Sequence, residues 1–171
     1  MKGRAIGAGL AALSMASQAA AQPVCVTAAE SDAIFATTLP GIMDNLRERC
    51  APRLPADSVL MARGGAAAER YRAAADAGRA LAIAALERVF ATGEPAVDDA
   101  LSGEAMLALF EAGFEAEMAP NLDARGCARA EAIFGAIEPL PAANLTRLIS
   151  VFMAIGAEDA DPGEAPPFRI C

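Results

Sequence analysis

The sequence contains no histidine and no tryptophan, and its one lysine is Lys2. Without histidine the chain cannot build Ser-His-Asp or Cys-His catalytic sites, histidine general bases or ordinary histidine metal centres. Without a lysine beyond position 2, Schiff-base and Ser-Lys chemistry are also excluded from the mature chain. A hydrolase built on paired carboxylates is the enzyme class that the composition still permits. We therefore predict a protein that is not an enzyme and that has no cofactor.

Residues 1–21 have the features of an export signal. A short basic start over residues 1–4 precedes a run of small and apolar residues over 5–16, and Ala19–Ala21 supplies the small-x-small pattern that signal peptidases recognise. The apolar run is shorter than the roughly 20 residues that a membrane-spanning helix needs. We therefore predict that the chain is cleaved after Ala21 and is periplasmic or secreted, without stable membrane insertion.

The charge of the chain is strongly acidic. It carries 22 acidic and 14 basic residues, which gives a formal net charge of −8. The predicted cleavage removes Lys2 and Arg4 but no acidic residue, so the net charge of the mature chain becomes −10. An acidic surface repels nucleic acid and anionic membranes, so neither is expected as a partner.

The mature chain has the length and composition of one helical domain. It is rich in alanine and leucine, has few clusters of β-branched residues and shows no internal repeat. We predict an all-α fold, a single small helical bundle of about five to six helices stapled by two disulfides. The bundle is expected over residues 22–157, followed by an acidic, proline-rich tail over residues 158–171 that packs on it.

Local signals divide the bundle into helices. Thr27 and Glu30 form a capping-box pattern at the start of a helix over residues 28–49, in which Pro40 is expected to cause a kink rather than a break. Gly64–Gly65 is expected to close a short turn that Asp57 caps. The further helices are expected from about 66 to 91, from Ser102 to Pro120, from Asp123 to Pro139 and from Pro141 to Gly156.

Four cysteines in an exported chain predict two disulfides, and three connectivities are possible. A continuous helix over residues 28–49 would be about 33 Å long, whereas bridged Cα atoms lie about 5–6 Å apart, so Cys25 should not pair with Cys50. We prefer Cys50–Cys127 with Cys25–Cys171, because chain ends often lie close together. The alternative pairs Cys25 with Cys127 and Cys50 with Cys171. Since there is no C-x-x-C motif, a structural role is favoured over a redox or metal role.

Two groups of residues are candidates for binding. Arg70, Tyr71 and Arg72 form the densest polar and aromatic group, and we treat them as a candidate ligand or partner site. The alternative is that Tyr71 is buried and hydrogen-bonded to a carboxylate. Residues at every fourth position form an apolar stripe that is expected to be core, with a groove for a partner helix or an apolar ligand as the alternative. This stripe consists of Met106, Phe110, Phe114 and Met118.

Three other patterns have ordinary explanations. Arg63–Gly65 precedes a helix but lacks the spacing of phosphate-binding glycine loops, so it is predicted to be an interhelix turn. Asp98–Asp99 and Glu104 are expected to lie at the positive end of a helix dipole rather than to form an acid–base pair. The acidic stretch over residues 158–164 lacks the ligand order of an EF-hand, which favours a solvated loop over a calcium site.

These observations lead to three functional hypotheses. The first is a non-enzymatic binding or structural module that presents its acidic surface or a helix groove to another protein of the cell envelope. The second is a carrier that holds a small apolar ligand between helices. The third, which we consider the weakest, is a carboxylate-based hydrolase.

Overall fold

The computed structural model describes residues 24–159 and 168–171, which form a helical bundle with one short pair of strands. The predicted all-α fold is confirmed. The predicted export signal and most of the acidic stretch over residues 158–164 lie outside the described residues. The elements are β1 (Val24–Val26), α1 (Ala28–Cys50), α2 (Val59–Phe90), α3 (Pro95–Ala100), α4 (Glu104–Met118), α5 (Ala124–Ile137), α6 (Ala142–Asp159) and β2 (Phe168–Ile170), with a 3-10 helix (Ala119–Asn121) after α4.

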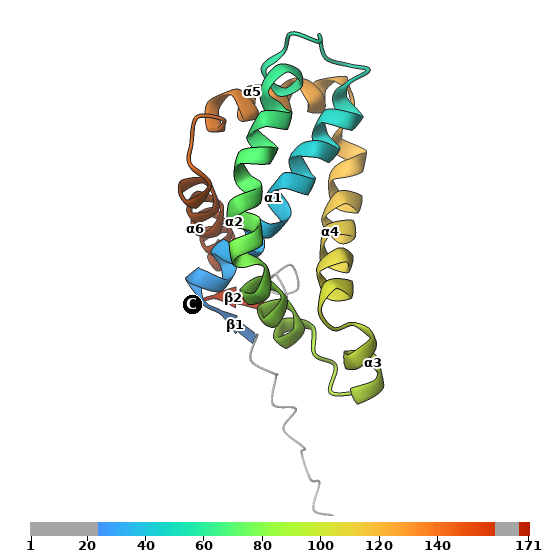
Figure 1. Ribbon diagram of the computed structural model, residues 1–171, viewed down its shortest axis with the longest axis vertical. Helices are drawn as coiled ribbons and strands as arrows, with labels where there is room; N and C mark the ends of the chain where they lie inside the picture. The colour runs from blue at the N-terminus through green and yellow to red at the C-terminus, as the bar shows by residue number, and fades with distance from the viewer. Residues whose placement is uncertain (1–23, 160–167) are drawn as a thin grey trace, which may run out of the picture.

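The two longest helices, α1 and α2, lie side by side and form the centre of the bundle (Figure 1). Helix α6 packs against α1 on one flank, α4 lies on the other flank, and α5 lies at the end where α1 connects to α2. The strands lie at the opposite end. The close approach of α1 to α2 depends on small residues: a Cβ atom on Gly78 would lie 3.3 Å from the Cα atom of Ala33. The buried alanines on α2 are Ala67, Ala68, Ala75, Ala82 and Ala85.

Helix α1 begins at the predicted capping box and is continuous to Cys50. The backbone N–H of Glu30 donates to Oγ1 of Thr27 over 3.3 Å, and the backbone N–H of Thr27 donates to the Glu30 carboxylate over 2.8 Å. Pro40 lies inside the helix and does not end it. The assumption that separated Cys25 from Cys50, a continuous helix between them, is therefore confirmed.

The predicted break at Gly64–Gly65 is wrong, because both glycines lie inside α2. Their lack of a side chain makes room for Arg47 of α1: a Cβ atom on Gly64 would come within 2.5 Å of Cδ of Arg47. The predicted cap is also wrong, since Ser58 rather than Asp57 caps α2 and accepts a hydrogen bond from the N–H of Met61 over 3.4 Å. The two glycines therefore mark a close helix–helix contact, not a turn.

Other helix boundaries differ from those predicted. Helix α3, which starts at Pro95, was not expected. Helix α4 begins after Gly103, whose φ of 58° suits glycine, rather than at Ser102. The backbone N–H of Gly103 donates to the carboxylate of Glu87 on α2, which holds this start in place. Helix α6 continues past Gly156, because a single glycine weakens a helix without ending it.

Two disulfides join distant parts of the chain, with the connectivity that the sequence favoured. Cys50 and Cys127 are fully buried in the larger hydrophobic cluster, and their Cα atoms are 5.5 Å apart. Cys25 and Cys171, which are exposed, have Cα atoms 5.9 Å apart. The larger cluster also contains Leu39, Met43, Leu60, Ala67, Ala68, Tyr71, Phe134 and Leu145, and a second cluster contains Val26, Ala33, Ile34, Ala82, Ala85, Leu86, Met106 and Leu107.

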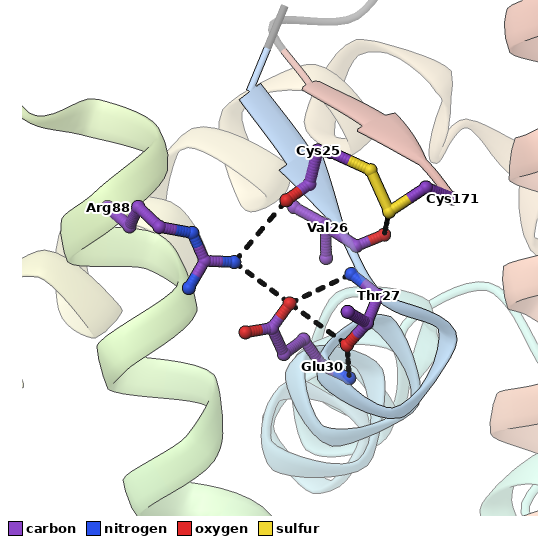
Figure 2. A network of polar contacts seen from close by, with 6 residues as sticks. All are labelled: Cys25, Val26, Thr27, Glu30, Arg88 and Cys171. Atoms are coloured by element: carbon purple, nitrogen blue, oxygen red, sulfur yellow. Dashed lines mark hydrogen bonds and ion pairs between the residues drawn. A yellow bond between two sulfur atoms is a disulfide. The ribbon is translucent and has the colours of Figure 1, made fainter.

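The tail was expected to be loop, but residues 168–170 form strand β2, parallel to β1. The backbone N–H of Cys171 donates to the carbonyl of Val26 over 2.9 Å. Arg88 of α2 also bonds to this end of the chain (Figure 2). Its guanidinium donates to the Glu30 carboxylate over 2.8 Å and to the carbonyl of Cys25 over 3.4 Å. The capping box of α1, strand β1 and α2 are thus held by one network.

The Glu30 carboxylate makes this network sensitive to pH. The hydrogen bond from Arg88, together with that from the backbone of Thr27, lowers the pKa of Glu30 below its ordinary value of 4.5. A carboxyl group whose pKa is lower in the folded state stabilises the fold above its ordinary pKa, and this stabilisation is lost as the pH falls through the folded-state pKa. We expect Glu30→Gln to lower the free energy of unfolding by about 1 kcal/mol at neutral pH.

Urea unfolding of the wild type and of Glu30→Gln, from neutral pH down to pH about 3, measures this effect. The difference in stability should be full at neutral pH and should shrink below pH 4.5. Glu48→Gln is the matched control, because Glu48 is exposed on the same helix and forms no ion pair with another described residue. A difference for Glu30→Gln that does not change with pH would contradict the assignment.

Candidate functional site

A cavity of about 610 Å³ opens between α1, α5 and the C-terminal end of α4, and we call it the α1–α5 groove. Apolar residues at three- and four-residue spacing place one stripe of α1 and one stripe of α5 on its walls. Helix α4 ends at Met118, and Pro120 lies in the 3-10 helix that follows. The apolar lining consists of Leu39, Ile42, Met43, Leu46, Met118, Leu122, Ala130, Ile133, Phe134 and Ile137.

The groove has a buried floor and an open rim. Leu39, Met43 and Phe134 are buried and belong to the larger hydrophobic cluster. At the rim, Ile133 is 61 % exposed, which is unusual for a large apolar side chain in the middle of a helix. The groove therefore joins the core directly to the surface, and an apolar group that entered it would cover side chains that now face solvent.

The charged residues of the rim come mainly from α5. Asp123 is committed to the helix start, because its Oδ1 accepts a hydrogen bond from the N–H of Gly126 over 2.7 Å. Arg125 and Arg129 lie one helical turn apart and are exposed, and neither forms a hydrogen bond or ion pair with another described residue. Glu117 of α4 also lines the groove. By contrast, the arginines that form ion pairs are Arg47, Arg63, Arg70, Arg72, Arg79, Arg88 and Arg147.

The apolar stripe of α4 is only partly core, which corrects the prediction. Met106 is buried, Phe110 and Met118 are partly buried, and Phe114 is 37 % exposed. The second half of α4 borders two cavities. A cavity of about 370 Å³ runs along it beside Phe90, and Met118 lines the α1–α5 groove.

Of Arg70, Tyr71 and Arg72, the first two contact one segment of the chain, residues 138–140, and the third contacts other residues. The partner of the Tyr71 hydroxyl is a backbone carbonyl and not the expected carboxylate. The Tyr71 side chain is buried and its hydroxyl donates to the carbonyl of Leu140 over 2.9 Å, and burial raises the pKa of this tyrosine. Arg70 binds the Glu138 carboxylate over 2.9 Å, whereas Arg72 binds Glu69 and Asp44. None of the three lines the α1–α5 groove or the cavity beside Phe90.

The acidic residues near α3 have structural partners. Asp98 accepts hydrogen bonds from the backbone N–H groups of Thr92 and Gly93, over 2.8 and 3.1 Å, and these bonds, above all that from Thr92, lower its pKa. Glu104 pairs with Arg79, and this contact lowers the pKa of Glu104. Within residues 24–159 and 168–171, no three acidic or cysteine side chains are grouped so that they could hold a metal ion.

Helix α6 has an apolar face that no other described helix covers. Leu148, Val151, Phe152 and Ile155 follow the spacing of a single helical stripe, and their exposed fractions run from 39 % to 64 %. The apolar spacing over residues 145–153 predicts that Leu145, Leu148 and Phe152 share one core-facing side of the helix. Only Leu145 of these three is buried, because α6 contacts α1 through its opposite side, where Ser150 bonds Asp32 over 2.7 Å.

No helix in the described part of the chain combines the length and the hydropathy that crossing a membrane requires. Comparisons with protein families, curated proteins and solved structures gave no match.

Proposed function

We propose that this protein is a non-enzymatic binding protein of the cell envelope that takes up the apolar part of a ligand in the α1–α5 groove. The observation that carries the proposal is the cavity itself. Its volume of about 610 Å³ falls within the range of roughly 300–1,000 Å³ that is usual for small-molecule sites. Such sites are lined mainly by apolar side chains with a few polar groups that orient the ligand, as this groove is.

The location in the cell envelope is supported by the sequence and by the disulfides. Residues 1–21 have the pattern of an export signal. All four cysteines are paired, and structural disulfides persist in oxidising compartments.

A binding role is favoured over catalysis by the chemistry of the groove. Its lining contains no serine, cysteine or tyrosine that could act as a nucleophile. Of its two carboxylates, that of Asp123 caps α5, which leaves Glu117 without a second carboxylate to act with. The remaining polar groups are suited to orienting a ligand.

The proposal is tested with the mature, oxidised protein and the neutral fluorescent probe N-phenyl-1-naphthylamine. We expect saturable binding of the probe, which Ile133→Glu should weaken by about tenfold or more, because a carboxylate at the rim resists dehydration when an apolar group enters. Ile155→Glu is the matched control, since Ile155 is equally an exposed helical isoleucine but lies on α6, outside the groove. Absence of saturable binding, or equal effects of the two variants, would contradict the proposal.

A second candidate function is that of an adaptor that binds another envelope protein through the exposed face of α6. The observation in its favour is the stripe from Leu148 to Ile155, since exposed apolar patches often mark interaction sites. Native purification followed by mass spectrometry separates the two functions. A stoichiometric protein that Ile155→Glu releases supports the adaptor, whereas a small molecule that Ile133→Glu releases supports the groove.

A further inference from the structure

We infer that the ligand of the α1–α5 groove is an anionic amphiphile with one hydrocarbon chain, such as a fatty carboxylate, whose carboxylate binds Arg125 and Arg129. This inference rests on the proposed function and adds the chemical class of the ligand. It is carried by the combination of an apolar cavity with two cations at its rim.

The two arginines are placed to act together. They occupy positions i and i+4 of α5, so they lie on the same side of the helix, and both line the groove. A guanidinium group presents paired N–H donors that match the two oxygens of a carboxylate. Ile133, one further turn along, continues the same face as an apolar side chain. A ligand with an acidic head and an apolar chain matches this order of residues.

The charge of these arginines is not balanced by an ion pair within residues 24–159 and 168–171. The chain has an excess of acids, and seven of its arginines are ion-paired, yet Arg125 and Arg129 pair with no described residue. The acids nearest to them in the groove are Asp123, which caps α5, and Glu117 on the α4 side. Two cations therefore face one uncommitted carboxylate, which leaves a net positive rim that favours a single negative charge.

The size of the cavity favours one chain over two. A volume of about 610 Å³ is in the middle of the range for ligands of ordinary small-molecule size, and the buried floor at Leu39, Met43 and Phe134 limits its depth. A single-chain carboxylate fits this description better than a phospholipid with two chains. The inference therefore commits to a free fatty carboxylate rather than to a membrane surface.

The experiment measures displacement of N-phenyl-1-naphthylamine by dodecanoate and by dodecan-1-ol, which share a chain but differ in charge. Dodecanoate should displace the probe at about tenfold lower concentration than the alcohol, and this preference should weaken as salt is added. Arg125→Gln with Arg129→Gln should abolish the preference and leave the affinity for dodecan-1-ol unchanged. Arg49→Gln with Arg53→Gln, which changes the net charge equally at exposed positions outside the groove, should preserve it.

The outcomes separate this inference from the proposed function. If both compounds displace the probe equally and the arginine variant has no effect, the ligand class is wrong although the groove binds apolar molecules. If the probe itself does not bind, the proposed function fails as well. A third arm uses vesicles of phosphatidylglycerol: binding to the vesicles that exceeds binding to dodecanoate identifies a lipid surface and overturns the inference.

Discussion

Replacing both Cys50 and Cys127 by alanine is expected to lower the free energy of unfolding by about 4 kcal/mol. The bridge joins residues that are 77 apart in the sequence, so it removes much of the freedom that the unfolded chain would otherwise gain between them. Both sulfur atoms lie in the larger hydrophobic cluster, at the end of α1 and within α5. Alanine is preferred to serine in this test, because a hydroxyl group at a fully buried position would add an unrelated cost.

Urea unfolding followed by circular dichroism measures the difference between the double variant and the wild type. The control is the same comparison after full reduction, in which neither protein has the cross-link. The difference should then fall to the packing contribution of the two missing sulfur atoms. A difference that is equally large after reduction would mean that packing, and not the cross-link, stabilises this part of the fold.

The second large effect is expected at Glu131, whose substitution by alanine should lower the free energy of unfolding by about 2–4 kcal/mol. The Glu131 carboxylate of α5 accepts hydrogen bonds from the backbone N–H groups of Val59 and Leu60, over 2.6 and 2.8 Å. These groups begin α2, and the first N–H groups of a helix have no partner within the helix. The negative charge also lies at the positive end of the α2 dipole.

Glu131→Gln provides a graded comparison, because the amide keeps one acceptor oxygen but loses the charge. We expect a loss of stability between those of the wild type and of the alanine variant. Hydrogen exchange at Val59 and Leu60 adds a local readout, since both amides should exchange faster in Glu131→Ala. Unchanged stability together with unchanged exchange at these amides would show that the carboxylate is dispensable.

Features that depend on residues near one another in the sequence were predictable. The capping box at Thr27 acts within three residues, and so does the cap formed by Asp123, at the expected start of its helix. Helix length excluded one cysteine pairing, because Cys25 cannot reach Cys50 once residues 28–50 form one helix. The choice between the other two connectivities depended on the tendency of chain ends to lie close together. The helical fold was predictable from composition and apolar spacing, because the three- and four-residue spacing of apolar residues lies within each helix.

Features that depend on distant residues were not predictable. Gly64–Gly65 indicated a turn because the side chain that fills their space, Arg47, belongs to another helix. The cap that Glu131 provides for Val59 joins positions 72 residues apart. The face of α6 and the second half of α4 were assigned to the core because spacing shows that a stripe exists, but not whether another helix covers it.

The candidate site depends both on residues near one another in the sequence and on distant ones. Arg70, Tyr71 and Arg72 are neighbours on one helix, yet only Arg70 and Tyr71 reach the same segment, residues 138–140. The i, i+4 spacing of Arg125 and Arg129 was visible in the sequence, but only the structure shows that both residues line one groove.

The two disulfides are nested, since the Cys25–Cys171 bridge encloses the Cys50–Cys127 bridge along the chain. A protease that cuts any one peptide bond between Cys25 and Cys171 therefore leaves two pieces that remain covalently joined. Damage of this kind would be invisible by size until a reductant is added. In a compartment that contains proteases, the parts of a nicked molecule would therefore stay covalently joined until the bridges are reduced.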